Sequence, residues 1–193
     1  MRFSHLRQLE IKLGLGFGLL FLCMVGILGA NFVVTTRYEA ITANLINHLY
    51  PARQQVRGIA ILQLSLDSIG ARYVLSYDPQ QQTQLLKTYQ QEVQELRTAI
   101  ATANTLADTP VQRIALSDFT QYFFGYGGYY ASNQEIFAQK QAGQLLGASD
   151  AYAQSPILST VQQDINTYIG VIDGEIAQAQ ADELANARLN QIL

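Results

Sequence analysis

Cysteine, tryptophan and histidine are rare or missing in this chain of 193 residues. The one cysteine, Cys23, excludes a disulfide framework and a cysteine metal cluster. The two histidines, His5 and His48, lie outside any Glu-x-x-His pattern, which disfavours a haem or di-metal site inside a helical bundle. No histidine is placed to act as the base of a catalytic triad. We therefore expect no enzymatic activity, no cofactor and no metal ion.

Charged residues are also sparse, at 14% of the chain, and the formal net charge is −3. This balance gives no indication of nucleic-acid binding. Proline occurs only four times, whereas glutamine and alanine, which are good helix formers, are abundant after residue 50. The hydrophobic content of 49% supplies an apolar core without disulfides. The composition therefore favours an all-α domain.

The longest uncharged run extends from Leu13 to Val34, between Lys12 and Arg37. It is long enough for one helical crossing of a bilayer, which needs about 20 apolar residues. The alternative is a cleaved secretory signal peptide, whose apolar core would be about 7–15 residues and would end in a small-x-small site. The candidate site after Ala30 has Leu28 at its −3 position. We therefore expect residues 13–34 to be retained as a transmembrane helix.

The flanks of this run predict its orientation. Arg2, Arg7 and Lys12 precede it, whereas only Arg37 follows closely. An excess of Lys and Arg marks the cytoplasmic side, so we expect residues 1–12 in the cytoplasm and residues 35–193 in the periplasm. The chain would then cross the bacterial inner membrane once. Small residues at four-residue spacing on one helix face also favour a homodimer; they are Gly14, Gly18, Gly26 and Ala30.

Apolar residues at spacings of three and four predict a series of long amphipathic helices after the anchor. We expect these helices over residues 35–77, 79–106, 110–146 and 149–193, with a kink at Pro51 and a turn at 147–150. Asp78-Pro79 and Thr109-Pro110 each place a capping side chain before proline, which is typical of a helix start. A further restart is possible at Ser155-Pro156. Short connections favour an antiparallel up-down-up-down four-helix bundle.

Several residues at these helix junctions form a recognisable pattern between Leu49 and Leu96 and beyond. They are Tyr50-Pro51, Asp67, Ala71-Arg72-Tyr73 and Leu75 in the first helix, Asp78-Pro79, Tyr89 and Leu96 in the second, and the Gly147 turn with Ala151. In this pattern the whole chain resembles the four-helix-bundle ligand-sensing domain of bacterial methyl-accepting chemotaxis proteins and related membrane sensors.

The resemblance implies a periplasmic domain between two membrane helices, followed by a helical linker and a cytoplasmic output module. These 193 residues contain no second apolar run and no signalling part. We expect the chain to be either the front part of a longer receptor or a truncated product. Chemotaxis, a kinase and cyclic-dinucleotide control are the outputs that the resemblance leaves open.

Arg53 and Arg57 are the first candidate ligand-binding residues. They lie four positions apart on one predicted helix and have no acid three or four residues away. Two arginines without partners suit the binding of a carboxylate. The resemblance also implies small anionic or amino-acid ligands bound by arginines of this helix. The alternative is a solvated polar face.

An aromatic stretch supplies the second candidate site. Residues 122–130 read YFFGYGGYY, with three glycines inside the predicted helix 110–146. Tyr122, Tyr126 and Tyr129 would line a pocket or a partner surface, because tyrosine offers apolar area with a polar tip. The alternative is close helix packing, with large rings filling the space above the glycines.

Two functions of different classes follow. The first is a non-enzymatic sensor in which a small molecule or a periplasmic partner protein binds the bundle and shifts its last helix relative to its first. The second is a membrane-tethered helical scaffold that binds a partner protein without signalling. Continuation of the reading frame into a second apolar run would favour the sensor.

Overall fold

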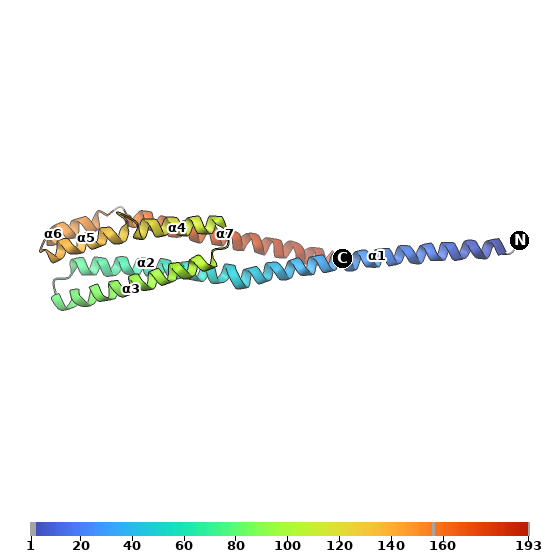
Figure 1. The fold of residues 1–193 in the computed structure, drawn as a ribbon, viewed down its shortest axis with the longest axis horizontal. Helices are drawn as coiled ribbons and strands as arrows, with labels where there is room; N and C mark the ends of the chain where they lie inside the picture. Colours follow the sequence, from blue (N-terminus) through green and yellow to red (C-terminus); the bar gives the residue numbers. More distant parts are fainter. Residues whose placement is uncertain (1–2, 156, 193) are drawn as a thin grey trace. The chain divides into compact units, whose positions relative to one another are not determined.

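The protein is all-α, as predicted. The computed structural model describes the backbone of residues 3–155 and 157–192, and the side chains of residues 14–155 and 159–188. Within these residues there is no β-strand. The helices are α1 (Phe3–Asn44), the π-helix η1 (Leu45–Leu49), α2 (Tyr50–Leu75), α3 (Pro79–Leu106), α4 (Pro110–Phe124), α5 (Tyr129–Gln141), α6 (Leu145–Ala153) and α7 (Ile157–Ile192), shown in Figure 1.

The chain divides into two compact units that differ from the expected segments. One unit is Leu45–Ala177, and the other combines Met1–Asn44 with Gln178–Leu193. Residues 35–44 and the end of the last helix therefore group with the apolar segment, although we expected them in the external domain. Inside this second unit, the Thr42 hydroxyl donates a hydrogen bond to Glu183 Oε1 at 3.2 Å.

Among the described residues, one helix is long and apolar enough to cross a membrane, and it begins near the N-terminus. Its apolar side chains are exposed, and Phe17, Leu20 and Phe21 each retain about two thirds of their accessible surface. A signal sequence would have the same length and composition. The helical span expected over residues 13–34 is therefore present.

At Pro51, where we expected a kink, the helical backbone continues and a π-helical turn precedes the proline. Pro51 lies in the first turn of α2, directly after the π-helical residues Leu45–Leu49. Proline has no N–H and crowds the carbonyl group four residues earlier, so the preceding turn widens instead of closing normally. Leu45 and Leu49 are buried, so this turn is packed into the core of its unit.

Both predicted capping signals are confirmed. The Asp78 side chain accepts a hydrogen bond from the Gln80 N–H at 3.0 Å, and α3 begins at Pro79. The Thr109 hydroxyl accepts from the Gln112 N–H at 3.2 Å at the start of α4. In both cases the proline costs no hydrogen bond, because the N–H groups of the first turn have no partner inside the helix.

The single helix expected over residues 110–146 is wrong, because the glycines interrupt it. Helix α4 ends at Phe124 and α5 begins at Tyr129. Between them Gly127 has a φ of 67°, in the left-handed region that favours glycine. The Gly125 N–H donates to the Gln121 carbonyl at 2.7 Å, and the Gly128 N–H donates to the Gly125 carbonyl at 3.0 Å. The glycines therefore form a tight connection between two shorter helices.

The expected turn at residues 147–150 is also wrong, because these residues lie inside α6. The chain turns earlier, after Gln141, where Gly143 has a φ of 84°. The predicted helix over 149–193 is consequently divided, since α6 ends at Ala153 and α7 begins at Ile157. Pro156 of the expected restart lies outside the described residues.

The core of unit 45–177 is formed by regularly spaced apolar residues of several helices, α5 included. Helix α2 packs against α3, α5 and α6, and α3 packs against α4. In Figure 1 α3 returns alongside α2, and α4 and α5 then continue in the direction of α2. The buried positions include Val56, Ile59, Leu66 and Tyr73 of α2, Tyr89, Val93 and Leu96 of α3, Leu116, Phe119 and Phe123 of α4, and Val161, Ile165, Tyr168 and Ile172 of α7.

Candidate functional site

Arg53 is not the free cation that its sequence neighbours indicated. Its Nε lies 2.6 Å from Asp173 Oδ1 of α7, and both side chains are a little more than one third exposed. A partly exposed ion pair contributes about 0–1 kcal/mol to stability, so the contact mainly aligns α2 with α7.

Arg57 lies one turn further along α2 and remains exposed. It makes no hydrogen bond or ion pair with any residue that the structure describes. The two arginines therefore differ: Arg53 is engaged by α7, whereas Arg57 faces solvent. The pair does not form a two-pronged carboxylate site within one chain.

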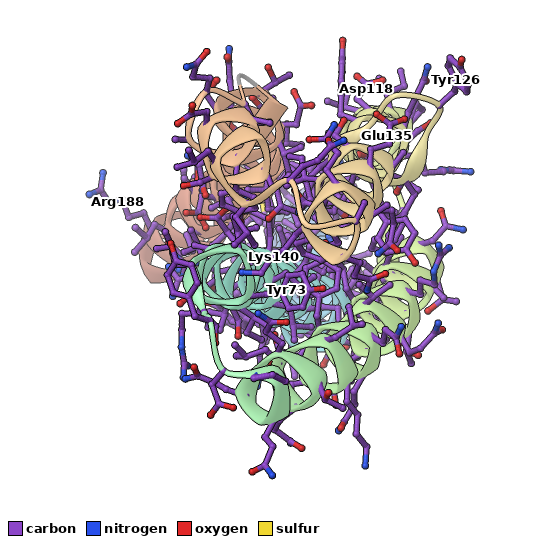
Figure 2. The ribbon with its side chains drawn as sticks, turned by 90° about the vertical axis from the view of Figure 1, so that its left-hand side faces the viewer. Tyr73, Asp118, Tyr126, Glu135, Lys140 and Arg188 are labelled. Carbon is purple, nitrogen blue, oxygen red and sulfur yellow. The ribbon has the colours of Figure 1, made fainter. Side chains whose placement is uncertain are left out.

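The three candidate tyrosines are not brought together on one surface. Tyr122 of α4 is half exposed, and Tyr126 is fully exposed in the glycine connection. Figure 2 shows Tyr126 projecting away from the ribbon. Tyr129, in contrast, is only 2% exposed and packs on Phe123 with 4.9 Å between ring centroids. Of the three, Tyr129 belongs to the core and the other two face outward.

Tyr129 is part of a hydrogen-bonded cluster that joins α2, α5 and α6. The Tyr152 hydroxyl of α6 donates to Asp67 of α2, with 2.7 Å to both the carboxylate Oδ1 and the backbone carbonyl. The Tyr129 hydroxyl lies 3.3 Å from the same Oδ1. Burial raises the pKa of both tyrosines far above the usual value, so both hydroxyls remain protonated donors. The cluster fixes α6 against α2.

A second polar cluster forms around Lys140, which is only 4% exposed. Its Nζ donates to the Ser76 carbonyl at 2.6 Å and to the Val74 carbonyl at the end of α2. The Tyr73 ring lies beside it, with 5.5 Å from Nζ to the ring centroid, as the labelled side chains in Figure 2 show. Burial lowers the pKa of Lys140 because the charged form loses hydration. A lysine at a helix C-terminus binds unpaired carbonyl groups and complements the helix dipole.

A groove between α3 and α4 combines open space with charged side chains. Its volume is about 650 Å³, within the usual range of about 300–1,000 Å³ for small-molecule pockets. One wall is the α3 face from Arg97 to Asn104, and the other is the α4 face from Arg113 to Phe124. Residues at spacings of three and four line each wall, as expected for single helix faces.

Arg97 is held in place by aromatic rings at one end of this groove. Its guanidinium carbon lies 4.0 Å from the centroid of Phe124 and 5.8 Å from that of Tyr130. Such stacking uses the face of the guanidinium and leaves its N–H groups, which lie along the edge, available. Arg97 makes no hydrogen bond or ion pair with the described residues. Arg113 is partly engaged, since its Nη2 donates to the Asp108 carbonyl at 2.9 Å.

Within the described part of the chain, no group of three or more His, Cys, Asp or Glu side chains could hold a metal ion. His48 is instead paired with Asp108, with 3.1 Å between Nδ1 and Oδ2.

Sequence reasoning missed Lys140, Tyr152 and the Arg97 groove for a common reason. Each depends on a contact between helices that are far apart in sequence, such as Arg97 with Phe124 or Lys140 with Val74. One signal was available: Lys87 and Lys140 are the two lysines after residue 50, and Lys140 falls four residues after Ile136 on a core stripe. Nothing local distinguished Arg97 from other exposed arginines.

No protein-family model matches the chain, and a search of curated proteins finds no significant match.

Proposed function

We propose that this chain is the extracytoplasmic ligand-sensing part of a bacterial membrane receptor of the chemoreceptor type. Helix α1 would anchor it in the inner membrane with the N-terminus in the cytoplasm, and residues 45–177 would form the non-enzymatic sensing domain. The observation that carries the proposal is the apolar helix α1 joined without interruption, through η1, to the first core helix of a separate compact unit.

We further propose that this domain is an antiparallel up-down-up-down four-helix bundle. The four segments would be α2, α3, the consecutive helices α4 and α5, and the first part of α7. The proposal is supported by the return of α3 alongside α2 in Figure 1 and by polar contacts that tie α7 to its neighbours. Thr109 Oγ1 and Gln112 Nε2 at the start of α4 both donate to the Glu175 carboxylate of α7.

A signal in such a receptor requires two arrangements of the helices with different affinities for the ligand. Helix α7 is suited to transmit the change, because it contacts α2 through Asp173 in one unit and α1 through Glu183 in the other. The small-residue face of α1 supports a homodimer in the membrane, in which such helices approach closely.

A thermal-shift screen of the full chain in detergent tests the sensing role. The panel would contain small carboxylates, amino acids and aromatic acids. A ligand at a hundred times its dissociation constant stabilises the folded state by about 2.7 kcal/mol, which gives a clear rise in Tm. At least one reproducible rise is expected. A folded helical sample that responds to no member of the panel would contradict direct small-molecule sensing.

The alternative function is a membrane-tethered scaffold, and a specific surface favours it. On α4, Val111 and Ile114 are 56% and 61% exposed and Tyr122 is 50% exposed, at helical spacing along one side. Exposed apolar residues in a row are typical of protein-binding surfaces. If the scaffold is correct, Ile114→Glu would abolish capture of a partner protein from membranes, while every panel ligand would leave Tm unchanged.

A further inference from the structure

We propose that the groove between α3 and α4 binds a small organic acid, with its carboxylate on Arg97 and its apolar body on Ile100, Leu116 and Phe124. This proposal deepens the proposed sensing function by naming a site and a ligand class. It places the ligand away from Arg53 and Arg57, and beside the aromatic stretch 122–130, which contributes Phe124 and Gly125 to the lining.

The charge of the groove selects an anion. Its lining contains the two arginines Arg97 and Arg113 and no aspartate or glutamate. The whole chain has a net charge of −3, so this cationic lining is a local feature. A concave surface with charges of one sign raises the local concentration of the opposite charge.

The state of Arg97 favours a carboxylate at its end of the groove. The Phe124 ring supports the guanidinium from one side at 4.0 Å, which restricts its rotamers before any ligand arrives. Its planar set of N–H donors matches the two oxygens of a carboxylate. Binding therefore removes little further rotational freedom from the Arg97 side chain. The loss of such freedom is one of the main costs of association.

The floor of the groove favours an apolar body beside the carboxylate. Ile100 and Leu116 line it and are only 9% and 2% exposed. Ala101 of α3 and Ser117 of α4 are small, which leaves open space between the two helices. A volume of about 650 Å³ accommodates an aromatic or branched aliphatic acid with room for water.

Benzoate titrated into the full chain in detergent tests this site, with binding followed by calorimetry and by Tm. Benzamide is the matched neutral ligand with the same ring, and acetate is the matched anion without an apolar body. Benzoate is expected to bind at millimolar or lower concentration, and both comparison ligands at least tenfold more weakly. The absence of benzoate binding at about 10 mM would overturn the proposal.

Two variants locate the site. Arg97→Gln removes the charge and is expected to weaken benzoate binding by about ten- to a hundredfold, as is typical when a hydrogen-bonded charge is lost. Ala101→Leu fills the groove without altering either arginine and is expected to abolish binding. Both positions are exposed, so unchanged far-UV circular dichroism is expected for each variant.

Arg57→Gln is the matched control, because it removes an exposed arginine of α2 outside the groove. Its benzoate affinity is expected to equal that of the unaltered chain. Equal benzoate affinity in Arg97→Gln and in Ala101→Leu would overturn the groove proposal. If other acids of the panel still raised Tm, the sensing function would stand and only this site and ligand class would fail.

Discussion

The partly buried Tyr152 and the fully buried Tyr168 illustrate how a tyrosine hydroxyl group has opposite effects on stability at two positions. The Tyr152 hydroxyl makes two contacts of 2.7 Å with Asp67. The Tyr168 hydroxyl is fully buried and has no hydrogen-bond partner among the described residues. A buried donor without a partner costs about 1–3 kcal/mol, whereas a satisfied one stabilises the fold.

Replacing each tyrosine by phenylalanine separates the two cases. Tyr168→Phe is expected to raise the free energy of unfolding by about 1 kcal/mol, because the unpaired hydroxyl is removed and the ring stays. Tyr152→Phe is expected to lower it by about 1–3 kcal/mol, because Asp67 loses its donor. Urea unfolding of the full chain, followed by circular dichroism, measures both. A loss of stability in Tyr168→Phe as large as that in Tyr152→Phe would contradict this account.

The same tyrosine predicts sensitivity to alkaline pH. Burial, and to a smaller extent the nearby Glu175 charge, raise the pKa of Tyr168 to about 12 from the ordinary 10.0. Between these values the folded state binds more protons than the unfolded state, so the free energy of unfolding falls as pH rises above 10. The decrease from pH 9 to about pH 11 is expected to be smaller in Tyr168→Phe than in the unaltered chain. Identical decreases would show that Tyr168 ionises normally in the folded protein.

At the scale of helices, the contact between α2 and α6 depends on Gly70. A Cβ placed at Gly70 would lie 2.7 Å from the Tyr152 hydroxyl oxygen, so α6 approaches α2 more closely than an alanine would allow. Gly58, on the same helix, has no atom within 4 Å of such a Cβ. The two glycines therefore have different packing environments, although both lie inside the continuous helix α2.

Gly70→Ala and Gly58→Ala form a matched pair. Gly70→Ala is expected to displace Tyr152 from Asp67 and lower the free energy of unfolding by about 1–3 kcal/mol. Gly58→Ala is expected to raise it by about 0.5–1 kcal/mol, because alanine is favoured over glycine within a helix. Thermal unfolding of the two variants gives the comparison. A stabilising Gly70→Ala would mean that α6 does not rest on α2 at this point.

Sequence patterns correctly predicted the helix starts that have strong local signals. They failed where contacts between helices determine the structure. Asp78-Pro79 and Thr109-Pro110 located the starts of α3 and α4 correctly, because capping is a local interaction. The break at Gly125–Gly128 was not predicted, because glycine is also tolerated inside helices. Only the left-handed backbone of Gly127 shows that a glycine is required at this position.

At the scale of the whole molecule, composition was sufficient to predict the fold class, but it did not predict the candidate site. The scarcity of proline and the abundance of helix formers predicted an all-α protein, and this is confirmed. The pairing of Arg53 with Asp173 and the stacking of Arg97 on Phe124 each join separate helices. Periodicity within one helix contains no information on such partners, so the candidate site changed once the helices were placed together.

Topology in the membrane tests the central claim most directly. In a Cys23→Ser background, Ser68→Cys places a single thiol at an exposed position of α2, and Ser4→Cys places one before the apolar run. A membrane-impermeant maleimide is applied to intact spheroplasts and to lysed ones. Ser68→Cys is expected to react in intact spheroplasts, whereas Ser4→Cys reacts only after lysis. Labelling of Ser4→Cys but not Ser68→Cys in intact spheroplasts, or loss of the chain from the membrane fraction, would contradict an anchored extracytoplasmic sensor.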